Sequence, residues 1–196
     1  MFWSNCSRKS LSDRIKFMEM SLYNEKEGNE FRDKIMADNV EWLMKVMYPG
    51  KKIILWAHND HLAKNTSKMS TIENGKWMNS FTSMGELLHK RLKGKEYVIG
   101  LYMNKGKTIT IATYKPFNIN PMPKGSLESL MMQSGYRNVF IDLSKHSTPN
   151  KNNAWMFKPI YAAEDGMTSE MIRPMLRPII KYYTGSIRLF GLLLGK

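Results

Sequence analysis

A chain of 196 residues can bury a sizeable hydrophobic core, and a single domain is the default expectation at this length. Its content of 42% hydrophobic and 24% charged residues is typical of a globular protein. No apolar run is long enough to span a bilayer, and the first residues lack the apolar segment of a signal peptide. A single cysteine, Cys6, excludes an internal disulfide, so we expect a cytoplasmic protein without membrane contact.

The chain is strongly basic, with 30 Lys and Arg residues against 17 Asp and Glu residues and a formal net charge of +13. Such an excess can steer a protein to nucleic acid, to anionic lipid or to an acidic substrate. The charges are spread along the chain, however, without a block of five or six. A solvated basic surface is therefore the favoured interpretation, and nucleic acid is not the expected partner.

A first helix is predicted over residues 10–23 by apolar residues at helical spacing. These residues are Leu11, Ile15, Met18 and Leu22. Gly28 is expected to separate this helix from a second helix over residues 30–47. We therefore expect an N-terminal helical segment at residues 1–28, followed by one α/β domain at residues 29–196.

The second predicted helix carries two neighbouring lines of residues. Its apolar edge consists of Phe31, Ile35, Trp42 and Val46. The adjoining line consists of Arg32, Met36, Asn39 and Leu43, which follow one another at i, i+4, i+7 and i+11. Polar side chains in line with Met and Leu are candidates for the wall of a binding site. The alternative is that Arg32 and Asn39 lie at the rim and cap loops, and spacing alone favours that alternative.

Residues 51–61 form the stretch around which we expect the fold to be organised. A short run rich in Ile, Leu and Trp ends at a polar cluster, which consists of His58, Asn59, Asp60 and His61. A run that is apolar on both faces is typical of a buried strand in a mostly parallel central sheet flanked by helices. Ligands in such α/β proteins bind at the carboxyl ends of the strands, so His58 and His61 are the first candidates for an active site.

The remaining elements are predicted from local patterns. Residues 64–80 are expected to form a polar loop, a candidate flap over the site. The later predictions are a helix at 83–92, two strands at 97–103 and 108–112 joined as a hairpin, a loop at 116–125, a helix at 127–133 capped by Ser126, a buried strand at 138–143, and a last helix near 171–182 interrupted by two prolines.

The chemistry that the sequence favours is general acid–base catalysis. No G-x-S-x-G, H-E-x-x-H, paired-cysteine or phosphate-loop motif is present. A metal site at His58 and His61 would need further ligands that the sequence does not reveal, so neither metal nor cofactor is expected. One histidine can deprotonate water while the other polarises the reacting group, and Arg32 can hold a carboxylate or an oxyanion. His89 and His146 are interpreted as structural.

Two motifs resemble the erythromycin esterase family. Residues 32–39 fit the family's R-D-x-x-M-A-x-N helix, and residues 56–61 fit its W-A-H-N-x-H strand end. The segments Met84–Leu88, Tyr97–Gly100 and Ser126–Glu128 follow in the family's order. The resemblance runs from about residue 29 to residue 143 and corresponds to the family's C-terminal half.

The resemblance implies an enzyme that hydrolyses a carboxylic ester by direct attack of water, without a covalent serine intermediate. In some members the ester is the macrolactone of erythromycin, which connects the family with antibiotic resistance. The catalytic cleft of the family maps onto His58 and His61, and Arg32 matches the arginine of the R-D helix. With Asn39 and Asn59, Arg32 is expected to bind the small-molecule substrate.

Family members are longer, and a further catalytic histidine and acidic residues come from their N-terminal half. We expect that half to be absent from this chain, which would leave apolar surface for self-association or for the missing half. Two other functions remain open. A basic, non-catalytic binding module would bind nucleic acid or an anionic surface in a salt-dependent way, and a metal-dependent hydrolase would lose activity with a chelator.

Overall fold

The computed structural model describes residues 2–23, 25–73, 76–109, 115–119, 124–143, 148–157, 160–162, 177–179 and 193–194. They form two compact units. The first unit comprises the described residues within 1–67, 80–98 and 191–196, and the second comprises those within 68–79 and 99–190. The expected division at residue 28 stays a prediction. None of the helices described in these ranges is long and apolar enough to cross a membrane.

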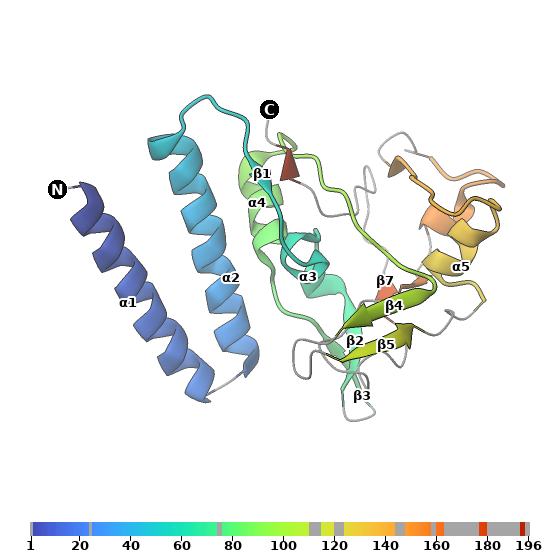
Figure 1. Ribbon diagram of the computed structural model, residues 1–196, viewed down its shortest axis with the longest axis horizontal. Helices are drawn as coiled ribbons and strands as arrows, with labels where there is room; N and C mark the ends of the chain where they lie inside the picture. The colour runs from blue at the N-terminus through green and yellow to red at the C-terminus, as the bar shows by residue number, and fades with distance from the viewer. Residues whose placement is uncertain are drawn as a thin grey trace. The chain divides into compact units, whose positions relative to one another are not determined.

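The first unit is mainly helical (Figure 1). Its elements are α1 (Phe2–Tyr23), α2 (Glu25–Trp42), the π-helical turn η1 (Leu43–Met47), β1 (Ile54–Leu55), α3 (Asn59–Leu62), α4 (Met84–Leu92) and β8 (Leu193–Leu194), with the 3-10 turn η2 (Thr66–Lys68) at its boundary. Helix α1 packs against α2, and α4 packs against both α2 and α3. Strand β1 pairs antiparallel with β8.

The face of α2 that enters the core is neither of the two lines expected from the sequence. Asp33, Ala37 and Val40 recur at i, i+4 and i+7 and are buried. The two apolar residues of this line pack with Leu62 and with other buried residues, namely Met84, Leu88 and Val98. A small residue and a carboxylate on the core face weaken the hydrophobic signal of the helix, and this explains why the pattern did not reveal that face.

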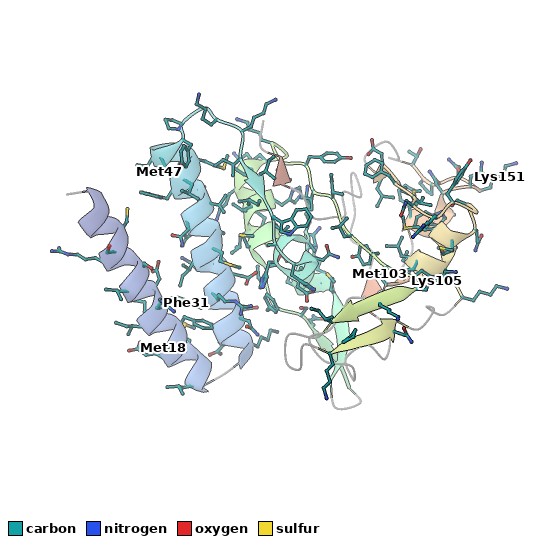
Figure 2. All side chains as sticks on the ribbon, viewed as in Figure 1. Met18, Phe31, Met47, Met103, Lys105 and Lys151 are labelled. Atoms are coloured by element: carbon teal, nitrogen blue, oxygen red, sulfur yellow. The ribbon has the colours of Figure 1, made fainter. Side chains whose placement is uncertain are left out.

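The predicted N-terminal helix is confirmed, but it begins earlier and its apolar stripe is exposed. Leu11, Ile15, Met18 and Leu22 all face solvent within the described unit, and Figure 2 labels Met18 on α1. Gly28 does not separate two helices, because it is buried inside α2. Helix α1 ends at Tyr23 and α2 begins at Glu25 instead.

The described residues of the second unit form short antiparallel strand pairs and one short α-helix. Its elements are β2 (Ser70–Glu73), β3 (Lys76–Asn79), β4 (Gly106–Ile109), β5 (Pro116–Ile119), α5 (Leu127–Met132), the 3-10 turn η4 (Ala154–Phe157), β6 (Ile160–Ala162) and β7 (Arg177–Ile179). The pairs are β2 with β3, β4 with β5, and β6 with β7. Leu127 and Ala162 are buried at the centre of a small apolar cluster.

The mixture of helices and strands is consistent with the expected α/β class. All strand pairs between described residues are two-stranded and antiparallel, so the mostly parallel central sheet is not observed there and stays a prediction. The run that ends at Trp56 is also not buried on both faces, because Ile54 is 64% and Trp56 is 80% exposed.

Several local predictions are corrected. Residues 64–80 do not form a structureless loop, because β2 and β3 pair as a hairpin there. The predicted hairpin of residues 97–103 with 108–112 does not form, because residues 97–103 are not a strand and β4 pairs with β5, inside the predicted loop at 116–125. Residues 138–143 are not a strand, and Phe140 is exposed. The predicted helix near 171–182 lies largely outside the described residues, and its residues 177–179 form strand β7.

Both helices with a predicted serine at their start are confirmed. The Ser83 hydroxyl accepts a hydrogen bond from the Glu86 N–H at the start of α4, and the Ser126 hydroxyl accepts one from the Ser129 N–H at the start of α5. Ser83 also donates to the Ala63 carbonyl oxygen at 2.8 Å. This cap therefore attaches the end of α3 to the start of α4.

The buried carboxylate of Glu86 holds the same junction from the other side. It accepts hydrogen bonds from the Ser67 N–H at 2.8 Å, from the Ser67 and Thr66 hydroxyls, and from Lys90 Nζ at 2.7 Å. Burial by itself raises the pKa of Glu86, but the hydrogen bonds from Lys90 and Ser67 outweigh it, and the net shift is downward.

Helices α3 and α4 approach closely at Gly85. A Cβ atom at this position would lie 2.1 Å from the Leu62 carbonyl oxygen, far inside van der Waals contact with rigid backbone. We predict that Gly85→Ala lowers the free energy of unfolding by about 3 kcal/mol, because the helices must separate. Gly94→Ala is the control. It meets no neighbour but has φ +82°, so its cost should be about 1 kcal/mol. Urea titrations measure both variants. An equal decrease in the free energy of unfolding for Gly85→Ala and Gly94→Ala would contradict the close approach of α3 and α4 at Gly85.

Stability should also depend on Glu86 at acid pH. Because its pKa is lower in the folded state, its stabilising contribution is complete above the unfolded-state pKa of about 4.5 and is lost as the pH falls further. We predict that Glu86→Gln makes the free energy of unfolding less dependent on pH below that value. Urea titrations at several pH values measure this dependence, and substitution of an exposed glutamate, Glu19→Gln, is the control. An unchanged acid dependence in Glu86→Gln would refute the assignment.

Candidate active site

The carboxylate of Asp33 joins three helices of the first unit. Asp33 lies on α2 and is fully buried. Its Oδ2 accepts a hydrogen bond at 2.8 Å from the backbone N–H of Met84, the first residue of α4. On α3, His61 Nδ1 lies 3.0 Å from Asp33 Oδ2 with hydrogen-bond geometry, and 2.9 Å from Oδ1. Because an ionised carboxylate only accepts, Nδ1 of His61 carries the hydrogen and Nε2 keeps its lone pair.

Arg32 lies at the free nitrogen of this histidine. Its Nη2 is 3.5 Å from His61 Nε2, at the outer limit of a hydrogen bond. Its Nε is 3.7 Å from Asp33 Oδ1. On the other side, Arg32 Cζ lies 5.9 Å from the centre of the Phe17 ring on α1, within cation–π range. The Arg32 side chain is 40% exposed, so a ligand can reach the guanidinium although Asp33 is inaccessible.

The His61 ring is partly sheltered. It is 24% exposed, and its centroid lies 6.4 Å from that of Phe81 with a tilt of 51°. A half-buried imidazole with one nitrogen fixed by a carboxylate and the other near a cation and solvent is suited to accept a proton from water.

His58 occupies a different position. Its Nδ1 accepts a hydrogen bond from the Asp60 N–H at 3.3 Å, which makes His58 the N-cap of α3, and it lies 3.6 Å from the Asp60 carboxylate. When Nδ1 accepts, the hydrogen of the neutral ring is on Nε2, which can then donate to an oxygen atom. His58 is 48% exposed, and among the described residues it forms neither a hydrogen bond nor an ion pair with Asp33 or Arg32. Asn59, the next residue, is half-buried at the first position of α3.

A cavity of about 680 Å³ lies between α1 and α2. Its walls are mostly apolar, and they are formed by Cys6, Ser10, Asp13, Arg14 and Phe17 of α1 and by Arg32, Ile35, Met36, Asn39, Trp42, Leu43 and Val46 of α2 and η1. The complete line that begins at Arg32 and continues through Asn39 to Leu43 faces this cavity. Arg32 thus contacts both the cavity and His61.

The structure thus brings Arg32 and His61 together, sets Asn39 seven residues along the cavity wall, and leaves His58 and Asn59 at the start of α3. Sequence reasoning missed Asp33, although it directly follows Arg32 in the motif. A carboxylate on the same helical line as Ala37 and Val40 was the available signal. The Met84 N–H carried no side-chain signal at all. Within the described ranges, no group of three or more His, Cys, Asp or Glu residues converges as a metal site.

Comparison with known proteins agrees with the motifs. Residues 14–183 match the family described as erythromycin esterase. This chain belongs to the erythromycin esterase family. It is also 37% identical over 144 residues to "Putative hydrolase YbfO" of Bacillus subtilis (strain 168), and the match covers 72% of this chain but 31% of that relative. The chain therefore spans about a third of the length of the curated relative it matches. No solved structure matches significantly.

The tautomer of His61 provides a direct test of the site. In Asp33→Asn the amide oxygen, in the place of Oδ2, can still accept from the Met84 N–H. The amide nitrogen, in the place of Oδ1, then lies 2.9 Å from His61 Nδ1 and disfavours a hydrogen there, and the negative charge that favoured this hydrogen is lost. We predict that the ring hydrogen moves to Nε2. Nitrogen-15 NMR at pH ~9, above the ordinary histidine pKa of about 6.5, reports the tautomer.

The control is Asp38→Asn, on the same helix, where the carboxylate accepts from Lys34 and Arg91 instead of His61. His61 should keep its hydrogen on Nδ1 in that variant. The His58 signals should stay unchanged in both variants. A wild-type His61 with its hydrogen on Nε2 would contradict the assigned contact.

Proposed function

We propose that this chain is a carboxylic ester hydrolase in which His61 activates water, Asp33 positions His61, and Arg32 stabilises the charge that develops on the carbonyl oxygen. The observation that carries the proposal is the chain of contacts from the Met84 N–H through Asp33 and His61 to Arg32, beside a mostly apolar cavity. Membership of the erythromycin esterase family and the likeness to a protein named as a hydrolase support the reaction class.

The proposed reaction needs one proton to move twice. Water attacks the ester carbon while His61 Nε2 takes a proton from it, and the carbonyl oxygen becomes an oxyanion beside Arg32. The tetrahedral intermediate collapses, the bond from carbon to the alcohol oxygen breaks, and His61 returns the proton to that oxygen. The products are a carboxylic acid and an alcohol. Asp33 does not touch the substrate, and its part is to fix the tautomer and the orientation of His61.

The other predicted site residues keep supporting roles in this proposal. His58 can donate from Nε2 to the ester oxygen, because its Nδ1 accepts the Asp60 N–H. Asn59 adjoins it on α3, and Asn39 faces the cavity, so both are proposed to bind polar groups of the substrate. The substrate is proposed to be a macrolide lactone, with antibiotic resistance as the outcome, or a related ester.

Two further expectations belong to the same proposal. The lone Cys6 supports a reducing, cytoplasmic location. The exposed faces of Ile54 and Trp56 support a larger, mostly parallel sheet in which β1 would be covered. The exposed stripe on α1 likewise favours self-association or contact with the additional residues of longer relatives, so assays require a measured oligomeric state.

Hydrolysis of erythromycin and of simple esters, followed by mass spectrometry, tests the function. We predict a gain of one water by the substrate. His61→Ala and Asp33→Asn should each slow the reaction by about 10²–10⁴-fold, because general-base catalysis and the tautomer are lost. Arg32→Ala should cost about 10²–10³-fold through loss of oxyanion stabilisation. His58→Ala should also lose activity.

Lys34→Ala and Asp38→Asn, both on α2 but outside the site, should retain activity and serve as controls, with circular dichroism as the test of folding. A chelator should have no effect, and inactivation by it would favour a metal-dependent hydrolase. Nucleic-acid binding that falls steeply with salt and ignores both histidines, without hydrolysis, would favour the binding module. Full activity in both His58→Ala and His61→Ala would overturn the mechanism.

A further inference from the structure

The cavity between α1 and α2 is elongated, and its length indicates which part of a substrate it can hold. Its wall on α2 and η1 runs from Arg32 to Val46. At 1.5 Å per residue this wall is about 20 Å long. The volume of about 680 Å³ lies within the range of small-molecule sites.

The two ends of the cavity differ in chemistry. At one end Phe17 of α1 lies against Arg32, whose guanidinium reaches His61 Nε2. Because α1 and α2 run antiparallel (Figure 1), Cys6 lies toward the other end, where Trp42 and Val46 provide apolar surface. One end thus has the Arg32 cation, which contacts the proton acceptor His61 outside the lining of the cavity, and the end at Trp42 and Val46 has neither group.

We propose that this cavity binds the linear apolar acyl chain of an ester, with the carbonyl group at Arg32 and the chain directed along α2 toward Val46. The inference rests on the proposed function for the chemistry at His61, but the binding of the chain itself does not. A site with a mostly apolar wall about 20 Å long and a cation at one end is complementary to a long-chain acyl group with one polar end.

The polar residues of the cavity fit this orientation. Asp13 and Arg14 belong to the turn of α1 that precedes Phe17, and so lie near the Arg32 end. Asn39 lines the cavity but is itself exposed to solvent. On the α2 side, Ile35, Met36 and Leu43 supply the continuous apolar surface that a methylene chain requires.

The experiment uses the full chain and p-nitrophenyl esters of butyrate, octanoate, laurate and palmitate, together with calorimetric binding of free laurate and palmitate. Each methylene buried should raise kcat/KM about three- to fourfold, up to the length that fills the cavity. Val46→Trp narrows the distal end at an exposed position. It should lower kcat/KM for palmitate about tenfold and leave butyrate unchanged.

Ile15→Trp is the matched control. It places the same large side chain on an exposed aliphatic position of α1, outside the cavity, and should leave the length profile of the wild type intact. Circular dichroism of both variants establishes that they are folded.

The outcomes separate the inference from the proposed function. Hydrolysis of all four esters without dependence on length would overturn the acyl site while the esterase stands. Absence of hydrolysis, with palmitate bound by the wild type and by Ile15→Trp but weakened in Val46→Trp, would support the acyl site and count against the esterase. Palmitate that does not bind, or that binds equally to Val46→Trp, would overturn the inference.

Discussion

The first unit depends on one buried carboxylate. Asp33 has no access to water, so its charge must be balanced by hydrogen bonds from the protein. The donors come from residues 28 and 51 positions further along the chain, on α3 and α4. Satisfying Asp33 therefore requires α2, α3 and α4 to pack together, and the same requirement orients His61. Stability and site geometry have a common origin in this part of the molecule.

Adjacent residues of α2 face different surroundings, one the hydrophobic core and the other the cavity. Successive helical residues point about 100° apart, so Asp33 faces α3 and α4 while Arg32 faces α1 and the cavity. Further along the helix the division repeats, with Ala37 buried beside Met36 on the cavity wall. A pair of neighbouring charged residues thus supplies one group that positions and one group that can bind.

Elements with local signals could be predicted from the sequence, and contacts over long distances could not. The helices that begin after Ser83 and Ser126 were predictable because a serine cap acts within three residues. The pairing of β4 with β5 was not, because alternation of apolar residues does not specify a partner strand. The site follows the same rule. Its histidines belong to a recognisable motif. The Met84 N–H that donates to Asp33 is a backbone group, and every residue except proline has one, so no sequence pattern indicates it.

The start of α4 makes opposite demands on two neighbouring positions. Residue 84 contributes its backbone N–H to Asp33, so other apolar side chains of similar volume could replace Met84 without removing the contact. Residue 85 contributes the absence of a side chain, because any Cβ would strike the Leu62 carbonyl group. Homologous chains with this arrangement should therefore vary among apolar residues at the first position and retain glycine at the second. An invariant glycine at this position would therefore identify chains with this active site as well as the two histidines do, although the glycine contacts no substrate.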